Sequence, residues 1–301
     1  MTILLEGKAV SSAIRTWVAS SVADLQKKYG WTPTLITVQI GENLASKRYI
    51  KNQIRACHEA GINARLEKFS ADIKKEDFLE EIASFVHDND VDGIIVQTPL
   101  PKGWCVNEIL SAIPPGKDAE GVHPENLGRL YLGEDGIPKP CTAWAALSLL
   151  EWYGRESFEG KRCVVIGRSA NVGRAVAIML MHKNATVTIC HTKTSSKQLK
   201  DAIASADVVV VAAGVAEIVD TKNLSPNAWV VDVGTNVSVD GRLIGDVTSS
   251  DITNVAALSP VPGGVGPITV SLLLVNLLLC ATKRRLEQGV LLPNLLDLRK
   301  K

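Results

Sequence analysis

The chain has 301 residues, of which 46% are hydrophobic, and its 33 basic and 32 acidic residues leave a formal net charge of +1. This length exceeds one typical core, so two domains are expected, and such balanced charge gives no sign of electrostatic nucleic-acid binding. The six cysteines are scattered without a C-x-x-C pair, which argues against a disulfide framework or a metal site and favours a reducing, cytoplasmic compartment.

The N-terminal part alternates helical and extended patterns. Helices are predicted over residues 9–28, 45–60 and 75–88, and strands over 33–40, 62–69 and 91–97. This order is typical of a parallel sheet covered by helices. Ligands of such α/β sheets bind beyond the carboxyl ends of the strands. Gln97 stands at one of these ends, and the sequence predicts that it faces a ligand or begins a proline-rich turn.

The second part contains a strand, turn and helix typical of dinucleotide binding. The apolar run Cys163–Ile166 ends at Gly167, Gly173 follows six residues later, and residues 174–180 have a helical pattern. Gly167 allows a sharp turn and Gly173 allows the helix to lie close to the strand, so backbone N–H groups can hold a pyrophosphate. The spacing departs from G-x-G-x-x-G, and an ordinary strand-to-helix turn is the alternative interpretation.

The next strand favours NADP over NAD. Residues 185–190 are extended and lead to His191, Thr192 and Lys193. An NAD-binding fold usually has an acidic residue here, which binds the ribose 2′-hydroxyl. A hydroxyl and a lysine stand there instead, and Arg168 lies in the first turn, so a 2′-phosphate fits better. The alternative is that Lys193 and Arg168 are solvated surface charges.

The remaining elements complete an α/β domain and a terminal helix. Residues 207–214 and 229–234 are predicted to be buried strands that end at glycines, and residues 258–269 form a loop rich in proline and glycine. The apolar run 272–280 is too short to span a bilayer, so a buried helix or a subunit contact is expected. Residues 1–8 lack the pattern of a signal peptide, and residues 294–301 are expected to be a frayed tail.

Eight ordered motifs stand out along nearly the whole chain: a tyrosine-containing helix at 45–62, Val96–Pro101, Lys117–Leu130, Lys139–Thr142, Gly167–Ser169, His191–Thr194, Asp232–Gly234 and Pro260–Pro267. Together they resemble the bifunctional methylenetetrahydrofolate dehydrogenase/methenyltetrahydrofolate cyclohydrolases, the FolD family.

The resemblance implies an α/β homodimer of two-domain subunits. Residues 1–140, with helix 268–290 packed back on them, would form a parallel-sheet folate domain, and residues 141–267 an NADP-binding Rossmann domain. The substrate would be a folate, with no membrane or nucleic-acid partner. Carried over by position, the folate site comprises Tyr49, Gln53, Gln97, Glu120, Pro262, Gly263 and Gly264, and the cofactor site comprises Gly167, Arg168, Ser169, Gly173, His191, Thr192, Gly234 and Thr235.

Two positions depart from the family pattern, and both belong to the folate site. The catalytic lysine of the tyrosine helix is Gln53 here, and the second aspartate of the Asp-Val-Asp-Gly motif is Glu120. Hydride transfer mainly requires alignment of the two reacting carbons, whereas hydrolysis of the methenyl product needs proton transfer. We therefore predict an NADP-dependent dehydrogenase with weak or absent cyclohydrolase activity. The alternatives are a fully bifunctional enzyme, a non-catalytic folate- or nucleotide-binding paralogue, and a dehydrogenase for another small substrate.

Overall fold

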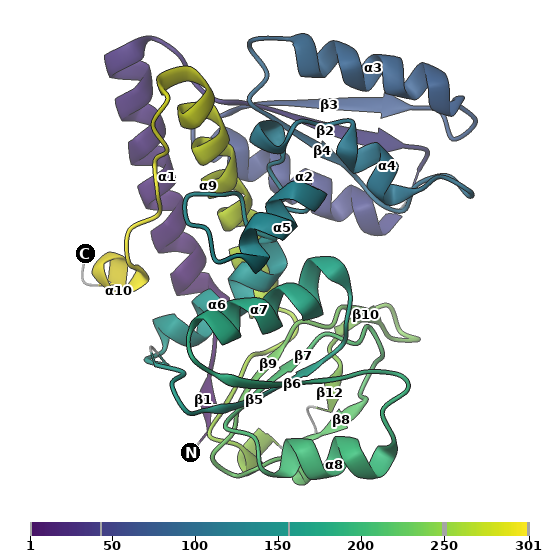
Figure 1. Cartoon of the computed structure of the whole chain (residues 1–301), viewed down its shortest axis with the longest axis vertical. Helices are drawn as coiled ribbons and strands as arrows, with labels where there is room; N and C mark the ends of the chain where they lie inside the picture. Colours follow the sequence, from purple (N-terminus) through teal and green to yellow (C-terminus); the bar gives the residue numbers. More distant parts are fainter. Residues whose placement is uncertain (1, 43, 156, 249–251, 300–301) are drawn as a thin grey trace. The chain divides into compact units, whose positions relative to one another are not determined.

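The computed structural model describes residues 2–42, 44–155, 157–248 and 252–299 (Figure 1). The chain divides into two compact units. Unit 1 comprises residues 1–12, 140–269 and 294–301, and unit 2 comprises residues 13–139 and 270–293. Residues 1–12 group with unit 1 because their strand joins its sheet, although a division at residue 140 would place them in the other domain.

Unit 1 is built on a six-stranded parallel sheet. Its strand order is β1 (Ile3–Leu4), β13 (Ala257–Leu258), β9 (Trp229–Asp232), β7 (Val208–Val211), β5 (Arg162–Ile166) and β6 (Thr186–Cys190). The expected parallel α/β class is confirmed. Smaller pairs accompany the sheet: β8 (Val219–Asp220) runs parallel to β12 (Val247–Thr248), and β10 (Asn236–Val237) runs antiparallel to β11 (Leu243–Ile244).

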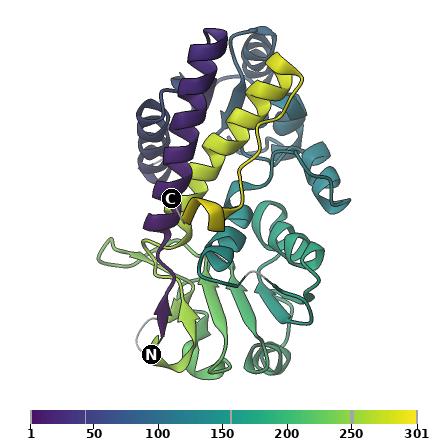
Figure 2. The ribbon, with the colours of Figure 1, turned by 90° about the vertical axis from the view of Figure 1, so that its left-hand side faces the viewer.

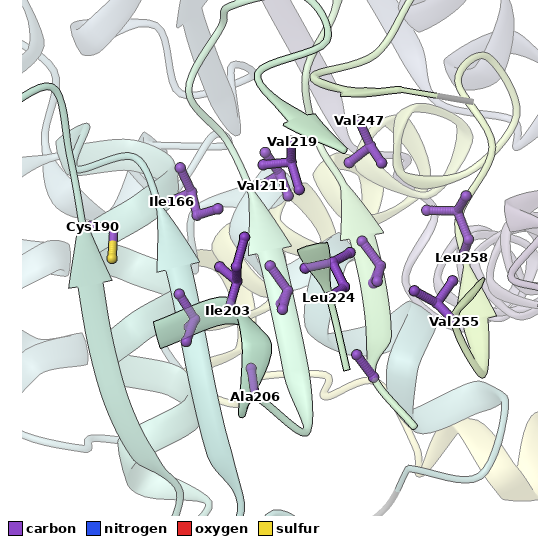
Figure 3. Packing of buried hydrophobic residues seen from close by; sticks show 14 residues of the cluster. Ile166, Cys190, Ile203, Ala206, Val211, Val219, Leu224, Val247, Val255 and Leu258 are labelled. Atoms are coloured by element: carbon purple, nitrogen blue, oxygen red, sulfur yellow. The ribbon is translucent and has the colours of Figure 1, made fainter. Parts of the chain in front are cut away.

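The inner strands β5, β7 and β9 are buried on both faces, which explains why they are nearly continuous apolar runs, whereas the edge strands β1 and β6 are largely exposed. On one face, Ile203 of α8 (Ser196–Ala204) packs in one buried cluster with Val211 of β7 and Leu258 of β13 (Figure 3). Helix α7 (Ala175–His182) packs against β5 and β6, and α6 (Cys141–Trp152) packs against α7 (Figure 1). The carboxyl ends of the strands are therefore the part of the sheet left for a ligand.

Unit 2 contains a three-stranded parallel sheet in the order β3 (Asn63–Phe69), β2 (Thr34–Ile40) and β4 (Gly93–Val96). Helix α3 (Lys75–His87) covers one face, where Phe78 and Ile82 pack on the even-numbered side chains of β2. A parallel bridge between Ile94 and Asp118 places the following segment beside β4. The unit also contains α2 (Leu44–Glu59), α4 (Val106–Ser111) and α5 (Pro124–Tyr131).

Two long helices, α1 (Gly7–Tyr29) and α9 (Val265–Leu286), begin in unit 1 and continue in unit 2. Within unit 2 they lie side by side (Figure 2), and Arg15 Nε of α1 donates a hydrogen bond to Ser271 Oγ of α9 over 3.1 Å. Helix α9 is long and apolar enough to cross a membrane, but 89% of its most apolar window is buried inside the protein. This burial is the expected environment of a core helix.

The C-terminal segment differs from the expected frayed tail. Residues Leu295–Arg299 form helix α10, Leu295 is buried, and Arg299 Nη1 donates a hydrogen bond to the carbonyl of Trp152 over 3.0 Å. The expectation was wrong because a five-residue helix depends on contacts with α6 rather than on its own periodicity. Residues 300 and 301 lie outside the described part of the chain.

Candidate functional site

Helix α2 presents Tyr49 and Gln53 on one side because residues four apart on a helix share a face. Gln53 is completely buried, and its Oε1 accepts a hydrogen bond from the Thr37 hydroxyl of β2 over 3.0 Å. Tyr49, one turn earlier, is partly exposed. The glutamine is therefore anchored to the sheet beneath the helix, while the tyrosine remains accessible near it.

Gln97 follows β4 directly and stays in register with the sheet. Its backbone N–H donates to the carbonyl of Val38 over 2.9 Å, and its side chain is buried. The two open sequence interpretations, a ligand-facing residue and the start of a turn, both fit this position. The strand does not continue past this point because Pro99 cannot donate a ladder hydrogen bond.

Glu120 lies in a loop that Asp118 organises. The Asp118 carboxylate accepts hydrogen bonds from the backbone N–H of Gly121 (2.9 Å) and His123 (2.8 Å) and from Asn126 Nδ2 (2.9 Å). Burial, together with the nearby charge of Asp118, raises the pKa of Glu120 to about 7. A carboxyl group with this pKa exchanges its proton near neutral pH, which general acid–base catalysis requires.

The turn after β5 is as tight as the glycines predict. Gly167 has a φ of +124°, and a Cβ there would lie 2.1 Å from the carbonyl oxygen of Ala212. A Cβ on Gly173 would lie 2.2 Å from the carbonyl oxygen of Gly167. Ser169 caps the helical segment that follows, a π-helical turn at Ala170–Arg174 leading into α7. The helix start thus lies directly against the strand end, the arrangement that suits a pyrophosphate.

The end of β6 lies beside this turn, because the N–H of Gly167 donates to the carbonyl of Cys190 over 2.9 Å. In the next turn, His191 Nδ1 accepts a hydrogen bond from the backbone N–H of Lys193 over 3.1 Å. Arg168 and Thr192 are both exposed. Neighbouring strand ends therefore bring together the residues that we assigned to the 2′-phosphate.

Gly234 and Thr235 follow β9, and two buried carboxylates hold their loop. Asp232 accepts hydrogen bonds from the N–H groups of Gly234, Asp246 and Val247 over 2.8–3.0 Å, and burial raises its pKa to about 6. Asp246 Oδ2 accepts from the N–H groups of Ala213 and Gly214 over 2.7 and 2.8 Å. The loops after β7 and β9 are thereby tied to one another at the carboxyl edge of the sheet.

The loop containing Pro262, Gly263 and Gly264 belongs to unit 1. The N–H of Gly7 donates to the carbonyl of Gly263 over 2.8 Å, and a Cβ on Gly7 would lie 1.9 Å from the carbonyl oxygen of Gly264. The start of α1 therefore anchors this loop through a close approach of two backbones.

The predicted site residues thus form two groups. Unit 2 holds Tyr49, Gln53, Gln97 and Glu120, and unit 1 holds the cofactor residues together with residues 262–264. Sequence reasoning missed Thr37, the partner of Gln53, and the two carboxylates Asp232 and Asp246. Thr37 inside β2 and Asp232 at the end of β9 are polar residues in otherwise apolar strands, which was the available signal for these two, whereas Asp246 lies between β11 and β12.

Comparison with known proteins assigns both halves of the chain. The model of the catalytic domain of tetrahydrofolate dehydrogenase/cyclohydrolase matches residues 5–120, and that of its NAD(P)-binding domain matches residues 140–285. The bifunctional protein FolD of Acidovorax ebreus is 41% identical over 281 residues, covering 93% of this chain and 98% of its own length.

Solved structures agree with this assignment. The bifunctional FolD enzyme of Campylobacter jejuni is 37% identical and superposes with a TM-score of 0.90, over 94% of this chain and all of its own. The Trypanosoma brucei enzyme, solved with NADP and an inhibitor, is 35% identical with a TM-score of 0.88, over 94% and 98% of the two chains. The predicted family and the NADP-binding Rossmann domain are confirmed. This chain belongs to the tetrahydrofolate dehydrogenase/cyclohydrolase family.

Proposed function

We propose that this protein oxidises 5,10-methylenetetrahydrofolate with NADP and that its cyclohydrolase activity is weak or absent. One observation carries the second part of the proposal. At the position of the family's catalytic lysine, the chain has a buried glutamine held by Thr37. A glutamine amide donates and accepts hydrogen bonds but does not titrate in the working pH range.

The dehydrogenase reaction tolerates this change. Bound NADP supplies the hydride acceptor, and the nitrogen lone pairs of the folate stabilise the methenyl cation that forms. The protein has to hold the folate in place and aligned. Tyr49, Gln97 and Glu120 provide a ring, an amide and a carboxyl group for this purpose, and the Gly167 turn fits the cofactor's pyrophosphate without a side chain in its way.

The hydrolytic step does not tolerate the change in the same way. Addition of water to the methenyl carbon and cleavage of a C–N bond both require proton transfer, and loss of a general acid–base typically costs about 10²–10⁴ in rate. The neighbouring lysines do not replace the missing group. Lys51 is exposed about 200° around the helix from Tyr49, and Lys47 Nζ is paired with Glu42 over 2.9 Å.

The experiment follows NADPH and methenyl product separately, with methylenetetrahydrofolate and NADP as substrates. Wild type is expected to form NADPH and to accumulate the methenyl product, whereas Gln53→Lys is expected to hydrolyse that product. Gln26→Lys, at an exposed position of α1, is the matched control for an added charge and should resemble wild type. Rapid hydrolysis by wild type would reject the proposed loss. Folate binding without NADPH formation would identify a non-catalytic paralogue, and a failure to bind folate would leave a dehydrogenase for another substrate.

A fully bifunctional enzyme is the second candidate, and one observation favours it. The pKa of Glu120, at about 7, lies where a replacement acid–base has to operate. Under this alternative, wild type hydrolyses the methenyl product and Glu120→Gln abolishes hydrolysis while NADPH formation continues. If Glu120→Gln lowers both activities equally, Glu120 binds the substrate without transferring its proton.

We further propose that the protein works in the cytoplasm as a homodimer. None of the six cysteines, all of which lie in the described part of the chain, forms a disulfide, and five of them are buried, which fits a reducing compartment. Light scattering of the purified protein is expected to give twice the 32.3 kDa chain mass. A monomer across the working concentration range would contradict the dimer.

A further inference from the structure

Strand β2 carries two polar side chains on a face that is otherwise apolar. Its even-numbered residues Ile36, Val38 and Ile40 pack under α3. Because side chains alternate along a strand, Thr37 and Gln39 project to the opposite face. The Thr37–Gln53 hydrogen bond shows that α2 covers this second face. A polar pair is thus buried between the sheet and α2.

The strand register brings three glutamines into one patch. Val38 pairs with Val96, and the N–H of Gln97 continues the ladder to Val38. Gln39 and Gln97 are therefore neighbours on strands about 4.8 Å apart, with side chains on the same face. Gln53 contacts Thr37, and Thr37 lies two residues before Gln39 on the same strand, at a distance of about 6.6 Å. We call Gln39, Gln53 and Gln97 the glutamine patch.

All three members of the patch have an unused donor. Their side chains are 4%, 0% and 9% exposed, and among the described residues the Nε2 atom of each has no hydrogen-bond partner. A buried donor without an acceptor costs about 1–3 kcal/mol. Three such donors close together indicate that a bound molecule supplies acceptors. Because these nitrogens are covered in this structure, the groups that cover them have to move before a ligand can reach them.

The Thr37 hydroxyl determines what Gln53 offers. It donates to Oε1, so the carbonyl end of the amide is held against β2 and the NH2 end is left for another partner. We propose that Thr37 is a positioning residue that fixes the Gln53 amide, so that its NH2 group donates, together with those of Gln39 and Gln97, to the carbonyl and ring-nitrogen edge of a bound heteroaromatic ring. The inference rests on the proposed function, in which this ring is the pterin of the folate.

This arrangement gives Gln53 a binding role, although it has no titratable group where the family has a lysine. A neutral donor at position 53 still binds an acceptor on the substrate, although it transfers no proton. The carboxyl group of Glu120 is an acceptor when ionised and thus suits the N–H groups of the same ring. The patch and Glu120 would then recognise complementary edges of one ligand.

The test compares Thr37→Val, which removes the hydroxyl at nearly constant volume, with Thr37→Ser, which keeps it. Tetrahydrofolate binding is measured by fluorescence titration, and KM for folate and for NADP by NADPH formation. Thr37→Val is expected to weaken folate binding roughly three- to tenfold, the range of one hydrogen bond. Thr37→Ser should stay near wild type, and KM for NADP should not change. Equal folate affinity of Thr37→Val and wild type would overturn the inference.

A double-mutant cycle with Gln53→Met separates positioning from general destabilisation. In the Gln53→Met background, Thr37→Val is expected to cause no further loss of folate affinity. The same loss in both backgrounds, with a parallel fall in thermal midpoint, would show a purely structural role. Gln39→Met should also weaken folate binding, whereas the exposed control Gln26→Met should not. An unchanged folate affinity of Gln39→Met would show that Gln39 does not bind the ligand.

The titration keeps this inference distinct from the proposed activity. If wild type binds tetrahydrofolate but forms no NADPH, the proposed activity fails while the binding comparison still decides the role of Thr37. If wild type does not bind tetrahydrofolate, the proposed function fails and the inference fails with it. If turnover is normal and Thr37→Val binds as wild type does, only the inference fails.

Discussion

Glu120 should make the stability of unit 2 fall as the pH rises. Its pKa is raised from 4.5 to about 7, mainly by burial, so the folded chain binds a proton that the unfolded chain releases between these values. The contribution of Glu120 to the free energy of unfolding is therefore fully present below pH 4.5 and is lost as the pH rises to about 7. One pKa unit corresponds to about 1.36 kcal/mol, so the loss reaches at most about 3 kcal/mol.

The substitution Glu120→Gln removes the ionisation and nearly preserves the shape of the side chain. Urea unfolding is followed by tryptophan fluorescence, to which Trp17, Trp31 and Trp104 of unit 2 contribute, and is measured at pH 5 and pH 8. The variant should gain stability relative to wild type at pH 8, and the difference should shrink at pH 5. Glu80→Gln, at an exposed position of α3, is the control and should give the same small difference at both pH values. A Glu120→Gln variant whose difference from wild type is independent of pH would refute the argument.

Three further substitutions probe unit 1. Gly167→Ala places a Cβ 2.1 Å from the Ala212 carbonyl at a φ of +124°, and we expect KM for NADP to rise more than tenfold while tetrahydrofolate affinity is unchanged; an unaltered KM would contradict the turn geometry. Asp246→Ala leaves the N–H groups of Ala213 and Gly214 without an acceptor and should lower the free energy of unfolding by roughly 3 kcal/mol; thermal unfolding beside the exposed control Asp240→Ala checks this. Arg168→Ala should raise KM for NADP far more than KM for NAD, and equal effects on both would exclude a 2′-phosphate contact.

Much of the fold could be predicted because local patterns agree with the tertiary structure. The β-branched run Val208–Val211 becomes a strand buried on both faces, and the helix predicted at 45–60 appears as α2. Helix α8 was missed, although Ser195 and Gln198 form a capping box, whose spacing is a recognisable signal in the sequence. Helix α10 had no comparable signal, because its stability depends on packing that the local sequence does not encode.

The candidate site was predictable only in part. The spacing of Tyr49 and Gln53 on one helix places both on the same face, and that much follows from helix geometry. The bond between Gln53 and Thr37 joins residues of a helix and a strand, so it requires knowledge of how α2 lies on the sheet. Likewise, Asp232 and Asp246 are fourteen positions apart, and their shared role appears only when the loops after β7 and β9 are folded.

The pairing of β1 has a consequence for synthesis of the chain. Ile3 and Leu4 are translated about 250 residues before Ala257 and Leu258, which form their partner strand. The folding of unit 2 also has to wait until α9 has been translated, because Gly93 packs against Leu277 of that helix. Contacts between such distant positions make folding slow, and neither unit can be completed while most of the chain is being translated. The nascent protein therefore exposes apolar surface for nearly the whole of its synthesis, so its yield should depend on chaperones that act before release.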